Sequence, residues 1–473
     1  MTSDRYRPQF HFTPLQNWMN DPNGLVYFNG EYHLFYQYNP YDRAWGHMHW
    51  GHAVGPDLVH WHHLPVALHE ETDTGITMFS GCAVVDWQDT SGFGSEGRPA
   101  IIATYTGDHR PVPLEDIHIA YSTDLGRSFT KYAGNPVIDA GSPKFGDPKV
   151  FWHEKTKKWI MVNILGNEQG CVVLYGSTDF RNWRYLSRFE APSVAPAIWE
   201  CPDLFPLTVD GDTDDIRWML KINNTDPTGQ QTWYFVGEFD GTTFTSESTA
   251  EEAAGGDYGE IYAEVTYNDI LAADGRRILI GWIRQQPMKE RPWTGAQSIP
   301  RVLSLHRGKQ SPVLRQTPVE EMKALRREHH HWDTVTLLET PPEPTRRLVG
   351  GEMEIEAEFE AGDASDFGLH LQMSAGGWAR IGYSTADRRL FVDQENGKRV
   401  EAPYSLTDRR LHVHVFIDHN LIEVFAGDGE TVITTALEPD PLCETVSLYT
   451  RGGRAQLIAL NAWNLSSALE RTI

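Results

Sequence analysis

The sequence predicts an all-β protein in which a β-propeller is followed by a β-sandwich. Along nearly the whole chain, short runs rich in Val, Ile, Phe, Tyr and Trp are separated by polar turns. An acidic residue that precedes a proline and an apolar stretch occurs three times before residue 210. Such repetition of a short-strand unit is typical of propellers. Near the end, strict alternation of apolar and polar residues indicates the half-exposed strands of a sandwich.

The three acidic repeats are WMNDPNG at residues 18–24, FGDPK at 145–149 and WECPD at 199–203. Proline lacks a backbone N–H and favours an extended residue before it, so each proline suits the start of a strand. If the repeats are equivalent, Asp21, Asp147 and Glu200 lie at the same end of three strands. Carboxylates that converge on one cleft are typical of glycoside hydrolases.

Each repeat leads into a hairpin. Residues 25–28 (LVYF) and 32–36 (YHLFY) flank an Asn-Gly pair, which is a strong signal for a tight turn between strands. Runs at 150–152 and 159–162 follow the second repeat in the same way, and runs at 204–205 and 218–220 follow the third. These hairpins support a repeated β-unit.

We predict three regions along the chain. They are a propeller over residues 1–310, a linker with a short helix over 311–345, and a β-sandwich over 346–473. The helix is expected at residues 319–328, with Met322 and Leu325 on one side and charges around them. The sequence PPEP at residues 341–344 predicts a stiff extended stretch. Alternating strands begin again with MEIEAEF at residues 353–359.

Composition narrows the classes of function. The chain has 473 residues, enough for two domains, and a formal net charge of −24. This charge disfavours binding to nucleic acid and to anionic membranes. Aromatic residues make up 11%, which suits sugar-binding surfaces and equally suits an ordinary all-β core. We expect a small carbohydrate as the partner.

Cysteine and histidine positions predict neither disulfides nor a metal site. The four cysteines (Cys82, Cys171, Cys201 and Cys443) are widely scattered. The histidine groups at 47–52, 60–63 and 329–331 have no cysteine or carboxylate at a zinc-binding spacing. We expect no metal and no cofactor, and we read residues 329–331 as a solvated linker face.

The N-terminal sequence MTSDRYR lacks the apolar core of a signal peptide. No apolar run approaches the ~20 residues of a membrane helix. A cytoplasmic location is therefore expected.

Further motifs resemble glycoside hydrolase family 32, which contains invertases, inulinases and levanases. The family pattern has WMNDPNG, RDP and EC blocks in that order, and this chain has the first and third intact. Other similar segments are YQYNP at 36–40, WG at 45–46, MHWGHA at 48–53, FSG at 79–81, DYG at 257–259, YA at 262–263, WTG at 293–295, IPR at 299–301 and IEVF at 422–425. The resemblance covers nearly the whole chain and implies five propeller blades, with the carboxylates on the innermost strands.

The resemblance also implies roles for individual residues. Asp21 is expected as the nucleophile, Glu200 as the acid and then the base, and Asp147 as the group that stabilises the transition state. Residues expected to contact the sugar are Asn20, Gln37, Trp45, Trp50, Phe79, Ser80, Asp257 and Trp293. For Asp257 a structural role is the main alternative, and Phe79 and Trp293 are equally compatible with the core.

One departure from the family pattern concerns substrate preference. Gly146 stands where the family has an arginine that usually helps hold the fructosyl hydroxyls. A glycine is expected to leave space there, and Lys144, Lys149 or Arg284 could supply a replacement donor.

These features favour a retaining β-fructofuranosidase. A fructosyltransferase, a fructan-specific exo-enzyme and a non-catalytic carbohydrate-binding propeller remain alternatives. The intact WMNDPNG and EC blocks argue against the inverting glycosidases that also use a propeller.

Overall fold

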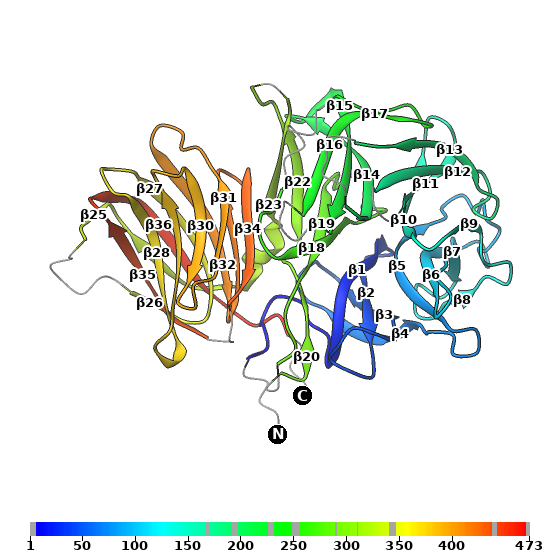
Figure 1. Cartoon of the computed structure of the whole chain (residues 1–473), viewed down its shortest axis with the longest axis horizontal. Helices are drawn as coiled ribbons and strands as arrows, with labels where there is room; N and C mark the ends of the chain where they lie inside the picture. Colours follow the sequence, from blue (N-terminus) through cyan, green and yellow to red (C-terminus); the bar gives the residue numbers. More distant parts are fainter. Residues whose placement is uncertain are drawn as a thin grey trace.

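The computed structural model describes residues 6–166, 170–191, 197–225, 231–247, 256–288, 291–309, 311–339, 347–437 and 442–469. Within these ranges the regular structure is almost entirely β-strand, which confirms the predicted fold class. Figure 1 shows a propeller of blue, cyan and green strands beside a sandwich of yellow, orange and red strands. No helix in the described ranges is long and apolar enough to cross a membrane.

The propeller consists of antiparallel four-stranded units that follow one another along the chain. The units are β1 (Asn17–Phe28), β2 (Glu31–Asn39), β3 (His49–Gly55) and β4 (His62–Leu68); β5 (Ile76–Val85), β6 (Ile101–His109), β7 (Glu115–Ser122) and β8 (Thr130–Lys131), with β9 (Ile138–Ser142) beside β7; β10 (Phe145–His153), β11 (Lys158–Leu165), β12 (Cys171–Ser177) and β13 (Arg184–Phe189); β14 (Trp199–Val209), β15 (Asp212–Asn224), β16 (Thr232–Phe239) and β17 (Phe244–Ser246); and β18 (Ile261–Thr266), β19 (Arg277–Ile283), β22 (Arg301–His306) and β23 (Val313–Pro318).

The first strand of each unit lies at the centre of the propeller. These strands, called the inner strands below, are β1, β5, β10, β14 and β18, and each contacts the next in a closed ring. The short strands β20 (Trp293–Thr294) and β21 (Ala296–Gln297) pair with β1 and β19. The arrangement is consistent with the five blades that the sequence resemblance implies.

The sandwich consists of two sheets that enclose one apolar core. One sheet contains β24 (Arg326–Trp332), β25 (Val335–Leu337), β27 (Glu352–Glu360), β32 (Arg410–Asp418), β33 (Leu421–Ala426), β34 (Thr431–Ala436) and β36 (Ala455–Leu465). The other contains β26 (Arg347–Val349), β28 (Asp366–Met373), β29 (Trp378–Ser384), β30 (Arg389–Gln394), β31 (Arg399–Pro403) and β35 (Cys443–Arg451). Buried apolar residues alternate with half-buried glutamates along β27, as its sequence predicts, except at Glu354, which is buried.

The segment predicted as a linker is more structured than expected. β23 pairs with β22 of the propeller, and β24 pairs with β36 of the sandwich. The helix predicted at residues 319–328 is a single 3-10 segment, η2 (Glu320–Leu325), which buries Met322 and Leu325 as expected. Pairing with the long strand β36 overrides the local helical pattern from Arg326 onward, so the histidines at 329–331 belong to a strand and not to a linker. The PPEP sequence lies outside the described residues.

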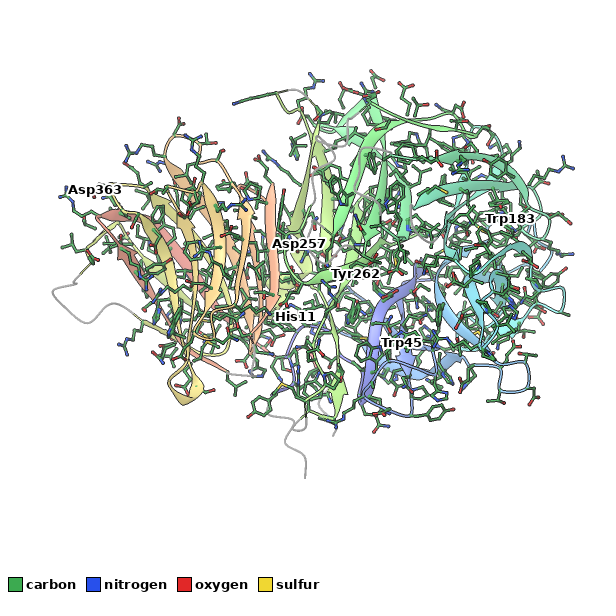
Figure 2. All side chains as sticks on the ribbon, viewed as in Figure 1. His11, Trp45, Trp183, Asp257, Tyr262 and Asp363 are labelled. Carbon is green, nitrogen blue, oxygen red and sulfur yellow. The ribbon has the colours of Figure 1, made fainter. Side chains whose placement is uncertain are left out.

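A buried ionic cluster joins the propeller to the sandwich. The Arg301 guanidinium donates to Asp257 Oδ2 (2.9 Å) and to Glu423 Oε2 (2.6 Å), and all three side chains are fully buried. His11 lies between Asp418 Oδ2 (2.9 Å from Nδ1) and Glu423 Oε1 (3.0 Å from Nε2). Figure 2 shows His11 and Asp257 where the two domains meet. The domains are therefore held together by charge pairs that have no access to water.

The cluster makes the stability of the domain interface depend on pH. Burial opposes the positive charge of His11, but hydrogen bonds and charges from Asp418 and Glu423 outweigh it and raise the pKa to about 9. Because the pKa is higher in the folded protein than its ordinary value, protonated His11 stabilises the fold below pH 6.5, and this stabilisation is lost as the pH rises through about 9.

We predict that replacing His11 removes this pH dependence. Between pH 6.5 and pH 9 the Tm of the wild-type protein should fall more steeply than that of His11→Gln, because the raised pKa corresponds to at most about 3 kcal/mol of stability. Thermal melts across this pH range measure the difference. His412→Gln, which changes an exposed histidine of the sandwich, is the control and should follow the wild type. Parallel pH profiles for wild type and His11→Gln would contradict the role of His11.

Candidate active site

Each inner strand carries a β-bulge at a corresponding position. The bulges fall between Met19 and Pro22, Met78 and Gly81, Gly146 and Lys149, Glu200 and Asp203, and Tyr262 and Val265. A bulge leaves one residue out of the strand pairing and re-aims its side chain. At three of them the backbone turns to positive φ, at Asp147 (50°), Cys201 (48°) and Ala263 (51°). Asp21, Ser80 and Asp147 lie inside their bulges, and Glu200 and Tyr262 are the last paired residues before theirs.

The three predicted carboxylates come together at these bulges. Asp21 Oδ2 accepts a hydrogen bond from Ser80 Oγ (2.6 Å), and Asp147 Oδ2 accepts one from the Cys201 backbone N–H (2.9 Å). The Cys201 sulfur lies 3.7 Å from Asp21 Oδ2 and 3.8 Å from Asp147 Oδ2, so it fills the space beside both carboxylates. Glu200 directly precedes Cys201 on β14.

Glu200 lies between a cation and a phenol. Lys144 Nζ donates to Glu200 Oε1 (3.1 Å), and Tyr262 Oη donates to Glu200 Oε2 (2.8 Å). Burial disfavours the charge on Lys144, but the carboxylates of Glu200, Asp147 and Glu115 outweigh burial and raise the pKa of its ammonium above the ordinary value. Lys144 is therefore a permanent positive charge beside Glu200.

The environment of Asp21 resists ionisation but does not prevent it near neutral pH. Burial raises its pKa to about 6, and the charges of Asp147 and Glu200 act in the same direction, while the hydrogen bonds from Ser80 and Asn20 oppose the shift. The pKa of Asp147 is also raised, first by burial and then by Glu200, with Lys144 opposing both. Asp21 is thus charged at pH 7 and has two fixed donors on its carboxylate.

Asn20 supports Asp21 from the same strand. Its Nδ2 donates to Asp21 Oδ1 (3.0 Å), while its Oδ1 accepts from Trp18 Nε1 (2.8 Å). The hydrogen bond from Trp18 therefore fixes the orientation of the Asn20 amide, so that its NH2 group points at Asp21. Of the predicted sugar contacts, Asn20 and Ser80 are the ones that bind a carboxylate directly.

Aromatic side chains and an arginine form the rim of the site. The rings of Trp45 and Phe79 meet edge to face at 5.9 Å. Arg110 lies 4.5 Å from the Trp45 ring centre and 5.6 Å from that of Phe79. Trp45 is 45% exposed, so its ring is available to a ligand. Figure 2 places Trp45 in the propeller, on the same domain as Tyr262.

Four further predicted sugar contacts are buried and already have partners within the protein. Gln37 (2% exposed) donates to the Met78 carbonyl, and Trp50 (0%) donates to the Phe79 carbonyl. Trp293 (0%) packs under Arg7. Asp257 (3%) belongs to the domain interface with Arg301. The structure uses polar atoms or ring faces of these four residues inside the protein, and direct sugar contact by them stays a prediction.

The space expected at Gly146 does not exist. A Cβ atom at this position would lie 2.6 Å from Thr106 Oγ1 and 2.9 Å from Thr106 Cγ2. Thr106 Oγ1 is held in place because it accepts the Asp147 backbone N–H (2.8 Å) and donates to the Ser80 carbonyl (3.2 Å). Thr106 therefore occupies the volume that a larger residue at 146 would need.

Of the three candidate replacements for the missing arginine, only Lys144 reaches the carboxylates. Lys149 binds the Thr266 carbonyl and lies 3.3 Å from Asp203 Oδ2, deeper in the propeller. Arg284 lies over the Tyr262 ring, 5.2 Å from its centre, and binds Gln231. The positive charge beside the carboxylates is thus that of Lys144, which stands two positions before Gly146 in the chain.

The sequence did not identify Tyr262 and Thr106 as residues of the site. Tyr262 stands at the bulge of β18, the position equivalent to Glu200 on β14. The sequence feature that could have identified Tyr262 is the family-like YA segment at residues 262–263. Thr106 lies on β6, outside every segment that resembles the family, so only the packing around Gly146 reveals it.

Comparisons with known proteins agree with this geometry. Residues 11–318 match the family model for the N-terminal domain of glycosyl hydrolases family 32, and residues 321–464 match the model for the C-terminal domain. A levanase of Bacillus subtilis is 40% identical over 96% of this chain and 70% of its own length. An extracellular exo-inulinase of Aspergillus niger is 34% identical over 98% of this chain and 95% of its own length.

Solved structures share the whole fold. The exo-inulinase of Aspergillus awamori superposes with a TM-score of 0.88 at 31% identity, over 98% of this chain and 99% of that one. A β-fructofuranosidase of Schwanniomyces occidentalis, solved with fructosyl-erythritol, gives a TM-score of 0.88 at 27% identity over 98% of this chain and 99% of that one. Family models that together span most of the chain, and relatives of this similarity, lead to one conclusion: the chain is a glycoside hydrolase of family 32.

Proposed function

We propose that this enzyme is a β-fructofuranosidase that removes terminal β-D-fructofuranosyl units from sucrose or fructans with retention of configuration. The observation that carries the proposal is the cluster of Asp21, Asp147 and Glu200 at the bulges of β1, β10 and β14. Retaining glycosidases need a nucleophilic carboxylate and a second carboxyl group that first donates and then accepts a proton. The relatives named levanase and exo-inulinase support fructans as the substrate class.

Asp21 fits the role of nucleophile. A nucleophilic carboxylate must be charged, and a pKa of about 6 leaves it charged at pH 7. Its attack on the anomeric C2 of the fructosyl unit would form a covalent ester and break the bond to the leaving oxygen. Ser80 and Asn20 fix the orientation of the carboxylate before the substrate arrives.

Glu200 fits the role of acid and base. In the first step it gives a proton to the leaving oxygen, and in the second it takes a proton from the attacking water. The first step leaves Glu200 as a carboxylate, which Lys144 and Tyr262 would stabilise with the bonds they already make. Asp147 would bind fructosyl hydroxyls and stabilise positive charge in the transition state.

Two alternatives rest on the same residues. A fructosyltransferase would pass the unit from Asp21 to a sugar and not to water, and the exposed Trp45 on the rim could hold such an acceptor. A binding protein without turnover would need none of the donors that orient Asp21.

A cytoplasmic location remains a prediction from the sequence. The four cysteines are all free and buried, which suits a reducing compartment without requiring one.

The function is tested by the products. We expect the enzyme to release fructose from sucrose, inulin or levan, and the first product seen by NMR to be the β-anomer or a β-linked transfer product. Initial appearance of the α-anomer would exclude double displacement. Absence of any product from all three donors would contradict the proposed substrate class, and accumulation of transfer products would favour the transferase alternative.

We predict that Asp21→Asn and Glu200→Gln each lower kcat by several powers of ten while the Tm changes little, because each keeps its shape but loses the reacting carboxylate. Glu200→Ala should recover part of its activity in azide, since a small anion attacks the intermediate without a base. Glu190→Gln, at an exposed position on the propeller, is the matched control and should behave as wild type. Turnover near the wild-type rate in Asp21→Asn would end the assignment of the nucleophile.

We predict that Lys144→Met lowers kcat/KM by about one to two powers of ten, because a charge-assisted hydrogen bond of roughly 1.5–3 kcal/mol to Glu200 is lost. Lys323→Met, which removes an exposed lysine from η2, controls for the loss of one positive charge. Gly146→Arg should not rescue Lys144→Met unless Thr106 is also made smaller, since Thr106 fills the required space. Unchanged kcat/KM in Lys144→Met would show that the lysine does not act on the reaction.

A further inference from the structure

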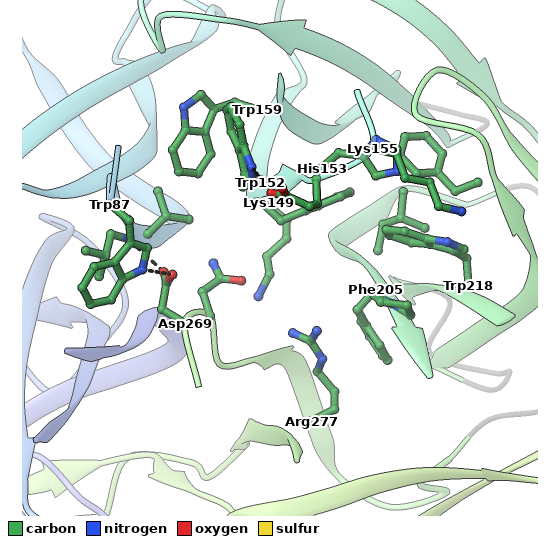
Figure 3. A pocket seen from close by; sticks show the side chains of 18 of the residues that line it. Trp87, Lys149, Trp152, His153, Lys155, Trp159, Phe205, Trp218, Asp269 and Arg277 are labelled. Atoms are coloured by element: carbon green, nitrogen blue, oxygen red, sulfur yellow. Dashed lines mark hydrogen bonds between the residues drawn. The ribbon is translucent and has the colours of Figure 1, made fainter. Parts of the chain in front are cut away.

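A second pocket lies farther along the inner strands. Its volume is about 640 Å³, within the range of roughly 300–1,000 Å³ that is typical of small-molecule sites. It is lined by the later residues of β5, β10 and β14, including Val85, Phe151 and Phe205. Figure 3 shows this pocket from close by. None of the three carboxylates of the candidate active site belongs to its lining.

Strand geometry separates the two sites. On β10, Phe151 follows Asp147 by four residues, which corresponds to roughly 13 Å of extended strand. A buried polar network fills the channel between them. Lys149 Nζ binds the Thr266 carbonyl and lies 3.3 Å from Asp203 Oδ2, and Asp203 Oδ2 accepts both the Thr266 N–H (2.8 Å) and its hydroxyl (2.8 Å). A ligand in this pocket would therefore not reach the catalytic carboxylates.

Tryptophan side chains stand on opposite walls of the pocket. Trp87 is 57% exposed, yet its ring is fixed, because Nε1 donates to Asp269 Oδ1 (2.8 Å) and its edge packs against Phe28. Trp218 is half-buried and packs edge to face against Phe239 at 5.0 Å. Figure 3 shows Trp87 and Trp218 on either side of Lys149 and Arg277. Trp218 also lies tilted against Phe151 at 5.5 Å. Aromatic rings that line a pocket and are held in one orientation provide flat surfaces for the C–H faces of sugar rings.

Charged groups in the pocket are balanced in sign. The lining contains the cations Lys149, Lys155 and Arg277 and the anions Glu154, Glu238 and Asp269. Within the described part of the chain, the Arg277 guanidinium donates one hydrogen bond, to the Tyr267 carbonyl (3.1 Å), so further N–H groups are available to a ligand. Mixed donors and acceptors suit hydroxyl groups, which both donate and accept, better than they suit an anion.

We propose that this pocket is a second, non-catalytic site for a neutral oligosaccharide, with Trp87 and Trp218 as its stacking surfaces and Arg277 as a hydroxyl donor. The choice of fructan segments as the ligand rests on the proposed function. A site that holds one part of a long fructan raises the local concentration of its chain ends near the enzyme. Its effect should be seen with polymers and not with sucrose.

The test measures binding in a protein that cannot consume the ligand. Glu200→Gln is titrated with an inulin-type and a levan-type oligosaccharide by calorimetry, and the contacted protons are identified by saturation-transfer NMR. We expect two binding events per chain. Adding Trp87→Ala should weaken one of them by roughly tenfold, which corresponds to about 1.4 kcal/mol, and leave the other unchanged. Trp87→Phe should keep most of the affinity.

Tyr185→Ala is the matched control, because Tyr185 is a similarly exposed propeller aromatic (55%) outside the pocket. In the active enzyme, Trp87→Ala should raise KM for long levan or inulin and leave kcat/KM for sucrose unchanged. A single binding event per chain would overturn the proposal, as would two events that Trp87→Ala does not alter. Competition by inorganic phosphate at the Trp87-dependent site would overturn it in favour of an anion site. Failure of the wild type to cleave any fructoside would contradict the proposed function alone, because the binding measurement does not depend on turnover.

Discussion

The site depends on one geometric constraint, the bulge that each inner strand carries at a corresponding position. A regular strand alternates its side chains between the two faces of its sheet, so it would direct neighbouring residues into the packing between blades. A bulge instead turns one residue toward the end of the channel. Because the inner strands form a closed ring, these bulges bring residues from different blades within hydrogen-bonding distance. The pairs Ser80–Asp21 and Tyr262–Glu200 are examples, each joining two different inner strands.

Three neighbouring carboxylates repel one another, and the hydrogen-bond donors around them offset this repulsion. Asp21 receives two neutral donors, Asp147 receives the backbone N–H of Cys201, and Glu200 receives the cation. The environments therefore differ in kind although the residues are chemically similar. In enzymes that use two carboxylates, the acid is usually the group whose environment opposes charge; here the cation stands beside Glu200, which favours its carboxylate form, the form that acts as base in the second step. Among the residues that the structure describes, the cation beside the cluster is Lys144, a flexible point charge, where an arginine would offer a rigid fork.

The sequence predicted the parts of the fold and site that depend on local pattern. The Asn-Gly hairpin, the acidic repeats and the alternation in β27 all act through neighbours in the chain, so they could be read directly. The helix at residues 319–328 could not, because pairing with β36, more than a hundred residues later, decides the conformation from Arg326 onward. The burial of Trp50 and Trp293 and the role of Thr106 at Gly146 likewise depend on contacts between blades. A sequence motif identifies such residues but does not distinguish a ring that faces the sugar from one that supports the wall.

The described residues of the sandwich do not contact the carboxylate cluster, yet the sandwich is connected to it through the backbone. Glu423 of β33 accepts the Ile299 N–H (2.8 Å) in addition to its bonds with Arg301 and His11. Two residues before Ile299, Gln297 donates from Nε2 to the Asn20 carbonyl (2.8 Å), immediately before the proposed nucleophile. The buried charge pairs of the domain interface thus fix the segment that supports the bulge of β1. A retaining mechanism needs its two carboxyl groups at a defined separation, so a domain remote from the substrate can contribute to catalysis by keeping Asp21 in its place.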